Sequence, residues 1–125
     1  MLMFQGDAEE ALQLYISLFA GSRIDSLLHW GPGEPGREGA FKQAEVTLAG
    51  YKLLIFDSPS KHEFGFTPAI SIFVDCADEA EWSSAYEKLS EGGMTLMPPG
   101  DYGFSKKFTW LNDRFGVSWQ LNLPS

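Results

Sequence analysis

Apolar residues recur at helical spacing in two segments of the chain, and each segment begins after an aspartate and ends at a glycine. The first runs from Asp7 to Gly21 and the second from Asp78 to Gly92. The apolar positions are Ala8, Ala11, Leu12, Tyr15, Leu18 and Phe19 in the first, and Trp82, Ala85, Tyr86 and Leu89 in the second. Aspartate before a helix and glycine after it are common boundary residues. The pattern therefore predicts two amphipathic helices.

Eight other segments are rich in alternating, β-branched or aromatic residues and favour β-strands. They are residues 1–5, 23–30, 41–48, 51–57, 69–76, 94–97, 105–111 and 117–123. The short Ala49-Gly50 turn predicts an antiparallel hairpin between the third and fourth segments. The turn from Asn112 to Gly116 predicts another between the last two.

The order strand, helix, three strands occurs twice along the chain. A shift of 71 places lays Asp7 on Asp78 and Tyr15 on Tyr86, which indicates an internal repeat. We therefore predict an α+β fold of two βαβββ modules, residues 1–57 and 69–125, joined by a linker at 58–68 within a single domain. The modules are expected to form a curved, mainly antiparallel, eight-stranded cup with the helices outside.

Alternation along the strands predicts which side chains face the cup. Trp119, Leu121 and Leu123 should face the helix, as should Ile70, Ile72 and Val74. The side chains expected to bind a ligand in the cup are Gln120, Trp110, Phe108, Ser71, Phe73, Glu45, Thr47 and Leu54. Such a lining of aromatic, apolar and amide groups suits a small amphipathic organic molecule. The alternative is that these side chains fill a packed interior or a subunit interface.

Composition narrows the classes of partner. The 125 residues carry 9 Lys and Arg against 17 Asp and Glu, a formal net charge of -8, which disfavours a nucleic-acid partner. No apolar run approaches the roughly 18 residues that span a bilayer, so we expect no membrane partner. A single cysteine and a start without signal-peptide features predict a cytoplasmic protein.

Several residues resemble known chemical motifs without their usual context. The segment from Gly31 to Gly36 matches a dinucleotide-binding Gly-rich pattern, but it contains two prolines and precedes a strand. We therefore predict a flexible hairpin loop, which could form a lip over the cup. His29 and His62 are isolated and could act as a base or a metal ligand, or simply lie on the surface. Cys76 is expected to be a buried small residue rather than a nucleophile.

Two stretches resemble a known family. They are Met3 to Ile24, which includes Phe4-Gln5-Gly6-Asp7, and the ending Asn112-Asp113-Arg114-Phe115-Gly116-Val117-Ser118-Trp119-Gln120. Both are similar to the PhnB-like branch of the vicinal oxygen chelate superfamily, which also holds glyoxalase I, bleomycin resistance proteins and extradiol dioxygenases. The resemblance implies paired βαβββ modules that form a cup, commonly in homodimers.

The resemblance also implies where a metal would be held. Enzymes of the superfamily generally bind a divalent metal with His, Glu or Gln side chains on the first and last strands of the modules. The corresponding positions here are Leu54, Ala69 and Gln120, and the fourth falls before Met1. One neutral amide cannot hold a divalent cation tightly, so we expect no metal and no other cofactor.

We therefore expect a homodimer that binds a small organic molecule in its cup, with no catalytic residue assigned. Two alternatives stay open. One is a metal-dependent lyase, isomerase or dioxygenase-type enzyme that recruits His29, His62, Glu45 or Asp57 as atypical ligands. The other is a non-catalytic interaction module.

Overall fold

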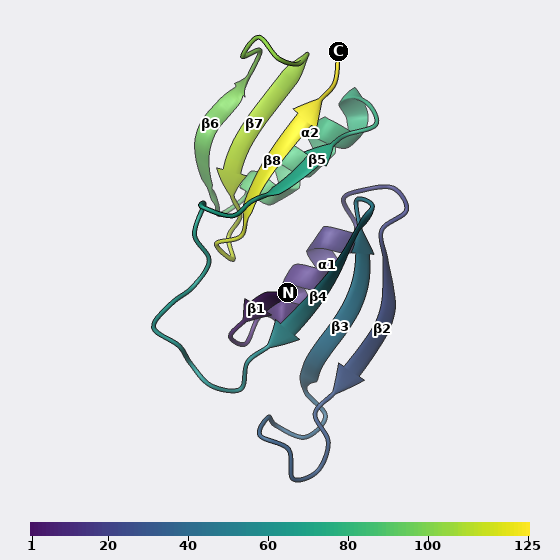
Figure 1. The fold of residues 1–125 in the computed structure, drawn as a ribbon, viewed down its shortest axis with the longest axis vertical. Helices are drawn as coiled ribbons and strands as arrows, with labels where there is room; N and C mark the ends of the chain where they lie inside the picture. The colour runs from purple at the N-terminus through teal and green to yellow at the C-terminus, as the bar shows by residue number, and fades with distance from the viewer. The chain divides into compact units, whose positions relative to one another are not determined.

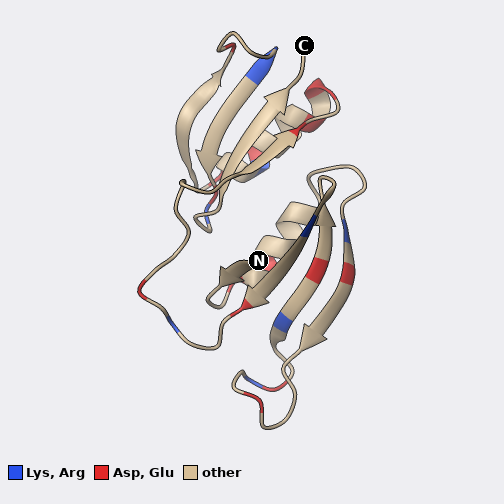
Figure 2. Cartoon of the chain, viewed as in Figure 1, with Lys and Arg blue, Asp and Glu red and all other residues tan.

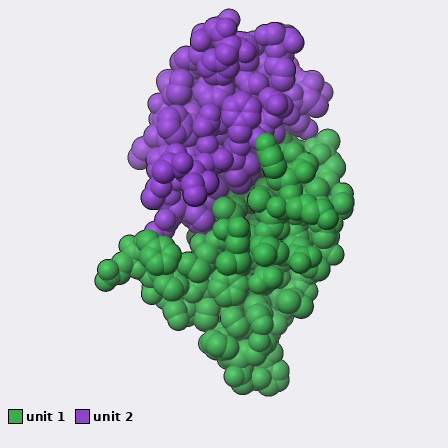
Figure 3. Space-filling view, in the orientation of Figure 1, with its two compact units in different colours: residues 1–64 green, residues 65–125 purple.

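The computed structural model describes all residues from 1 to 125 and divides them into two compact units. Residues 1–64 form one unit and residues 65–125 form the other (Figure 3). Each unit contains one strand, one helix and then three strands (Figure 1). The repeat detected in the sequence is therefore a repeat of structure, and each unit is called a module below.

The first module contains a four-stranded mixed sheet with one helix. Its elements are β1 (Leu2–Phe4), α1 (Ala8–Ile16), β2 (Arg23–His29), β3 (Phe41–Leu48) and β4 (Tyr51–Asp57). The strand order is β1-β4-β3-β2. β1 runs parallel to β4, and the other two pairs are antiparallel.

The second module repeats this plan. Its elements are β5 (Ile72–Asp75), α2 (Glu79–Ser90), β6 (Met94–Gly100), β7 (Lys107–Asn112) and β8 (Ser118–Leu123). The order β5-β8-β7-β6 matches that of the first module, again with one parallel pair, β5 with β8. The predicted α+β fold with two βαβββ modules and mainly antiparallel strands is confirmed. Neither helix has the length and hydrophobicity needed to span a lipid bilayer.

Each helix covers one face of its own sheet and buries every second strand residue there. In the first module, Leu12 and Tyr15 of α1 are fully buried together with Val46 and Ile55 of the sheet. In the second, Trp82 of α2 is buried, and its indole Nε1 donates to the carbonyl of Leu121 at 3.1 Å. Burial of apolar surface on one face of each sheet thus holds each module together.

The two helices begin differently, although both follow an aspartate. The Asp78 carboxylate accepts a hydrogen bond from the amide of Glu81 at 2.8 Å, and the Glu81 carboxylate accepts one from the amide of Ala77 at 3.0 Å. This reciprocal arrangement resembles a capping box. Asp7 makes no side-chain capping bond, so that part of the expected symmetry is absent. α1 also ends at Ile16, short of Gly21.

The segment before β5 departs from the expected strand. β5 begins at Ile72, and the residues from 69 to 71 are outside the sheet. Ile70 is 79% exposed, so the expectation that it lies under the helix is wrong, whereas Val74 is buried as expected. A run of alternating residues can continue past the end of the partner strand, and only the pairing with β8 decides where the strand starts.

The turn between β7 and β8 is built around one buried carboxylate. Asp113 is buried, and its Oδ1 accepts from the amides of Phe115 and Val117 at 2.9 and 3.0 Å. Its Oδ2 accepts from the indole Nε1 of Trp119 at 3.0 Å. This carboxylate therefore joins the turn to the core of the second module.

Cys76 lies directly after β5 and is buried, and its amide donates to the carbonyl of Asn122 at 2.8 Å. Burial, followed by the nearby negative charges of Glu81, Asp75 and Asp78, raises the pKa of the Cys76 thiol to about 12. A thiol in these surroundings stays protonated and is a poor nucleophile.

We predict that Asp113→Ala lowers the free energy of unfolding by about 3 kcal/mol, because three donors, two of them buried, lose a charged acceptor. The matched control is Asp101→Ala, which removes an exposed turn carboxylate that accepts only from the amide of Gly103 and should cost less than about 1 kcal/mol. Urea unfolding followed by tryptophan fluorescence gives both values. Equal losses in the two variants would contradict the anchoring role of Asp113.

We predict that the thiol of native Cys76 reacts with a disulfide reagent at pH 8 far more slowly than the same thiol in urea. The raised pKa of the folded thiol also makes stability depend on pH. The contribution of the thiol to the free energy of unfolding is complete below about pH 8.5, the ordinary pKa of a thiol. It is lost as the pH rises toward the folded pKa of about 12. Unfolding curves of wild type and Cys76→Ala across this range measure the effect. Rapid labelling of the native protein would contradict the assignment.

Candidate functional site

Each sheet has one face that its own helix leaves uncovered, and these open faces carry the residues predicted from alternation. On the first module, the register pairs Glu45 with Leu54 and Thr47 with Lys52, so these four side chains share the open face. All four are at least partly exposed. The structure thus brings the three predicted residues Glu45, Thr47 and Leu54 together.

A β-bulge adds a residue to this face that alternation did not predict. The pairing of β2 with β3 shifts between Ile24 and Ser26. The carboxylate of the intervening Asp25 accepts from Thr47 Oγ1 at 2.7 Å and from Arg23 Nε at 2.8 Å. These partners, first the Thr47 hydroxyl and then Arg23, hold the pKa of Asp25 below its usual value. Strict alternation gives the wrong face at a bulge, so the sequence carries no clear signal for Asp25.

The open face of the first module contains a hollow of about 470 Å³. It is lined by Met1, Asp25, Glu45, Val46, Lys52, Leu53 and Leu54. Its wall combines two carboxylates, one ammonium group and the apolar side chains of Met1 and Leu54. Figure 2 shows acidic and basic residues on the three neighbouring strands β2, β3 and β4.

The open face of the second module carries amide and aromatic side chains. The register pairs Trp110 with Gln120 and Phe108 with Asn122. Gln120 Nε2 donates to Ser71 Oγ at 2.8 Å, and Trp110 Nε1 donates to Ser118 Oγ at 2.8 Å. The predicted residues Gln120, Trp110, Ser71, Phe108 and Phe73 therefore gather in one region of this module.

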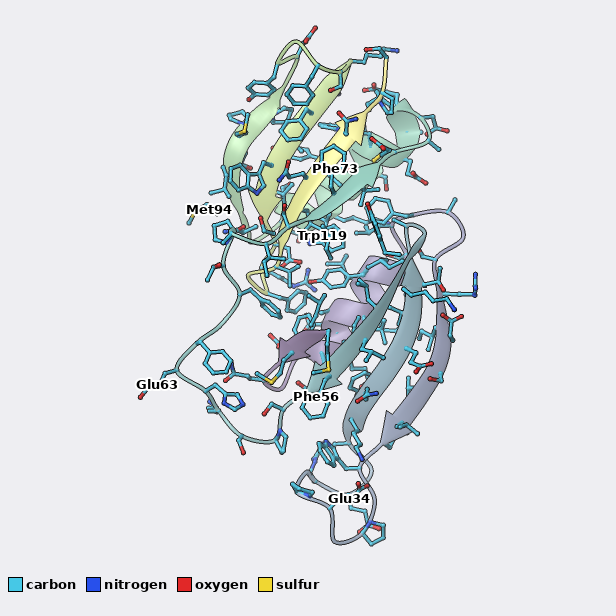
Figure 4. The ribbon with its side chains drawn as sticks, in the orientation of Figure 1. Glu34, Phe56, Glu63, Phe73, Met94 and Trp119 are labelled. Atoms are coloured by element: carbon cyan, nitrogen blue, oxygen red, sulfur yellow. The ribbon has the colours of Figure 1, made fainter.

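Four aromatic rings form a cluster on this face, and two of them were not predicted. Phe108 is 3% exposed because Phe104 lies edge-on to it at 4.9 Å between ring centroids and Tyr102 at 5.9 Å. Phe73 packs against Phe108 at 6.4 Å and, like Tyr102 and Phe104, is itself exposed. Figure 4 shows Phe73 on β5. Phe108 is thus the base of the cluster, and the outer rings are those that a ligand could reach.

Tyr102 and Phe104 lie in the loop between β6 and β7, and strand alternation makes no prediction for loop residues. The useful signal is their composition: two aromatic residues within the polar, Gly-containing loop Asp101 to Phe104. Tyr102 is fixed there by its hydroxyl, which donates to the carbonyl of Pro98 at 2.6 Å. These two rings pack over Phe108 and still leave an exposed apolar surface.

The two open faces differ in chemistry. Figure 2 shows Lys, Arg, Asp and Glu on the strands of the first module, whereas β5 to β8 are mostly without charge. Met94 is exposed at the start of β6 and adds a flexible apolar side chain to the second sheet (Figure 4). The charged face and the aromatic face are therefore suited to different ligand groups, although they belong to equivalent sheets.

The three positions at which the resemblance implies metal ligands carry residues that do not suit a metal ion. Leu54 offers no ligand atom, and Ala69 lies before β5 starts and offers none either. Gln120 supplies one amide, whose nitrogen already donates to Ser71. No group of three or more His, Cys, Asp and Glu side chains is placed to share a metal ion. Divalent cations need several carboxylate, carbonyl or imidazole ligands, so the residues at these positions do not fit a divalent metal ion.

The two histidines stand apart from this chemistry. His29 is at the exposed end of β2. His62 lies between the modules' sheets in sequence, where its Nε2 is 3.0 Å from Ser58 Oγ and its ring stacks on Phe64 at 4.9 Å. Its amide donates to Gln5 Oε1 at 2.8 Å, so it ties residues 58–64 back to the end of β1. Neither histidine lies with Glu45 in a cluster that could hold a metal.

Comparisons with known proteins agree on one family. The family model described as 3-demethylubiquinone-9 3-methyltransferase matches residues 1–122. A solved PhnB protein from Bacillus cereus, described with the same enzyme name, is 49% identical; the match covers 98% of this chain and 95% of that chain, with a TM-score of 0.90. No match was found among curated proteins.

More distant structures share the fold. Protein PA1353 from Pseudomonas aeruginosa is 26% identical over 98% of this chain and 93% of that chain, with a TM-score of 0.83. The fosfomycin resistance protein FosX from Listeria monocytogenes shares the fold at 12% identity, over 99% and 88% of the two chains, with a TM-score of 0.58. The chain is therefore a member of the PhnB-like family, the one whose model is named for 3-demethylubiquinone-9 3-methyltransferase.

Proposed function

We propose that this chain binds a small, partly aromatic organic molecule on the open faces of its sheets, and that it does so without a metal centre. The observation that carries this is the cluster of Phe73, Tyr102, Phe104 and Phe108, whose outer three rings are exposed. Exposed aromatic rings held in fixed geometry offer a stacking surface for a planar group.

The polar group beside this cluster supports a specific contact. Gln120 Nε2 is occupied by Ser71, which fixes the amide plane, and Gln120 Oε1 accepts no hydrogen bond from the chain. An oriented amide oxygen prefers a ligand hydroxyl or N–H donor. The same side chain is the one survivor of the superfamily's metal-ligand positions, so we assign it to hydrogen bonding instead.

Names of relatives are weak guides to a reaction here. FosX was solved with Mn(II) and 1S,2S-dihydroxypropylphosphonic acid, but its likeness to this chain is in fold alone, and this chain has no cluster of three His, Cys, Asp or Glu side chains that could hold a metal ion. The methyltransferase name implies a methyl donor. The two strand-to-helix turns, residues 5–7 and 76–78, contain one glycine in total, so neither is a Gly-rich turn of the kind that opens a nucleotide-cofactor site. Methyl transfer is therefore not assigned to this chain.

Assembly and location remain predictions. The homodimer follows from the resemblance to the family, and light scattering on a size-exclusion column would measure it. We also propose that the chain forms a single domain with residues 58–68 as a linker. We propose a cytoplasmic location as well.

We predict that Phe104→Ala weakens binding of a planar aromatic ligand by about fivefold, because an outer stacking ring is lost. The ligand would be identified by titrating tryptophan fluorescence with a library of small aromatic acids, phenols and amides. Phe64→Ala is the matched control, since Phe64 is 63% exposed and Phe104 60% exposed, and it should leave the dissociation constant unchanged. Quenching by no library member, or equal loss in both variants, would contradict the aromatic site.

We predict that the same binding is unchanged by a chelator and by added Ni²⁺, Mn²⁺ or Zn²⁺. Isothermal titration with each metal should give no stoichiometric binding in the micromolar range, because the required ligands are absent. Tight one-to-one binding that Glu45→Ala or His29→Ala removes would instead support the metal-dependent enzyme.

A further inference from the structure

A second hollow in the first module lies at the loop between β2 and β3, away from the residues used above. This loop contains the Gly-rich segment expected to be a flexible hairpin. Glu34 marks the loop in Figure 4, beyond the ends of the two strands. Residues on both sides of this hairpin contact one side chain, Trp30.

The base of the loop is closed by a pair of backbone hydrogen bonds. The amide of Trp30 donates to the carbonyl of Ala40, and the amide of Gly39 donates to the carbonyl of Trp30, both at 2.8 Å. Inside the loop, Glu34 accepts from the amide of Gly31 at 2.6 Å and from Lys42 Nζ at 2.7 Å. These partners, first Lys42 and then Gly31, keep the pKa of Glu34 below its usual value.

The indole ring of Trp30 packs against the loop and against side chains of β3 and β4. Lys42 Nζ is 5.0 Å from the centroid of its ring, and the ring of Phe56 lies edge-on at 6.1 Å. Gly36 approaches the indole so closely that a Cβ at this position would overlap the ring. The glycine is therefore required for the loop to lie against the indole.

The hollow next to the Trp30 ring has a volume of about 290 Å³. Its walls come from Gly6, Trp30, Pro35, Gly36, Arg37, Ala40, Phe41, Asp57, Ser58 and Pro59. It thus lies between the loop and the chain that leaves β4, and all its residues belong to the first module. None of them is among the residues proposed for the open faces.

Three polar groups in this hollow have unused hydrogen-bonding capacity. Asp57 Oδ1 accepts from the amide of Gly6 at 2.6 Å, which leaves Oδ2 without a partner from the chain. The Arg37 guanidinium forms no ion pair, in contrast to Arg23. The indole Nε1 of Trp30 donates to no acceptor, although this residue is only 8% exposed. This nitrogen is not among the buried polar atoms that lack a partner, so it reaches the surface and can donate to a bound molecule.

We propose that this hollow binds a small zwitterion that carries one carboxylate and one ammonium group, such as a free amino acid. Arg37 and the Trp30 N–H bind the carboxylate, and Asp57 binds the ammonium group. Pro35, Pro59 and Phe41 supply an apolar wall for the side chain. This site is additional to the proposed function and does not depend on it.

Charge and size favour a zwitterion over two simpler ligands. Asp57 would repel a plain anion, and Arg37 would repel a plain cation, whereas a zwitterion pairs with both groups. The volume is near the lower end of the range of about 300–1,000 Å³ for small-molecule pockets, so it suits a molecule of amino-acid size and is small for a nucleotide.

The test uses three probes of nearly equal size: L-leucine, 4-methylpentanoate without the ammonium group, and 3-methylbutylamine without the carboxylate. The indole N–H resonance of Trp30, assigned with Trp30→Phe, reports binding in a ¹⁵N-labelled sample. We expect L-leucine to shift this resonance and to bind about tenfold more tightly than either of the other probes. Failure of L-leucine to shift it up to its solubility limit would overturn the proposal.

Two variants separate the charged contacts. Arg37→Gln and Asp57→Asn should each weaken L-leucine binding about tenfold, and the Asp57→Asn side chain keeps an oxygen that can accept from the amide of Gly6. The matched controls are Arg114→Gln and Asp101→Asn in the second module, which should leave L-leucine binding unchanged. Asp101 accepts from the amide of Gly103 as Asp57 does from that of Gly6, so both aspartate variants preserve their turn.

Equal affinity of L-leucine for wild type and for the Arg37→Gln and Asp57→Asn variants, or equal affinity of L-leucine and 4-methylpentanoate for wild type, would overturn the zwitterion site. Loss of binding at the aromatic cluster leaves this result unaffected, because the two sets of residues do not overlap. The two proposals can therefore fail separately.

Discussion

Coverage of a sheet by a single helix is the constraint on which the rest of this structure depends. A four-stranded sheet has two faces, and each module supplies one helix to bury one of them. Residues such as Val46, Ile55, Trp119 and Leu121 must therefore be apolar, because they form each module's core. The other face is free of that demand, and its side chains can be selected for contacts with other molecules.

The two modules use this freedom differently at matching positions. Glu45 pairs with Leu54 on the first open face, and Trp110 pairs with Gln120 at the equivalent place on the second. An acid and an aliphatic side chain in one module thus correspond to an indole and an amide in the other. The buried faces kept one pattern while the open faces diverged, which is why the repeat is visible in helix boundaries and turns rather than in the candidate site.

The sequence predicted which strand residues are buried and which are on the open faces. It predicted fewer of the residues whose positions depend on a bulge, a strand end or a loop. Alternation placed Gln120, Trp110 and Leu54 on the open faces because strands alternate strictly where pairing is regular. It missed Asp25, which a β-bulge turns to the open face, and it placed Ile70 in a strand that begins later. Tyr102 and Phe104 were missed because their positions are set by a loop, through one hydrogen bond to Pro98 and ring contacts with Phe108.

The Gly31 to Gly36 segment shows why a local pattern does not determine function. Its glycines match a phosphate-binding pattern, but the next element is β3 rather than a helix, so no helix N-terminus is available to bind phosphate. The close approach of Gly36 to Trp30 gives another reason for a glycine, namely to let the loop lie on a buried indole. The loop contributes to a hollow whose lining includes both a cation, Arg37, and an anion, Asp57. These two residues are far apart in sequence, and only the folded chain brings them to one hollow.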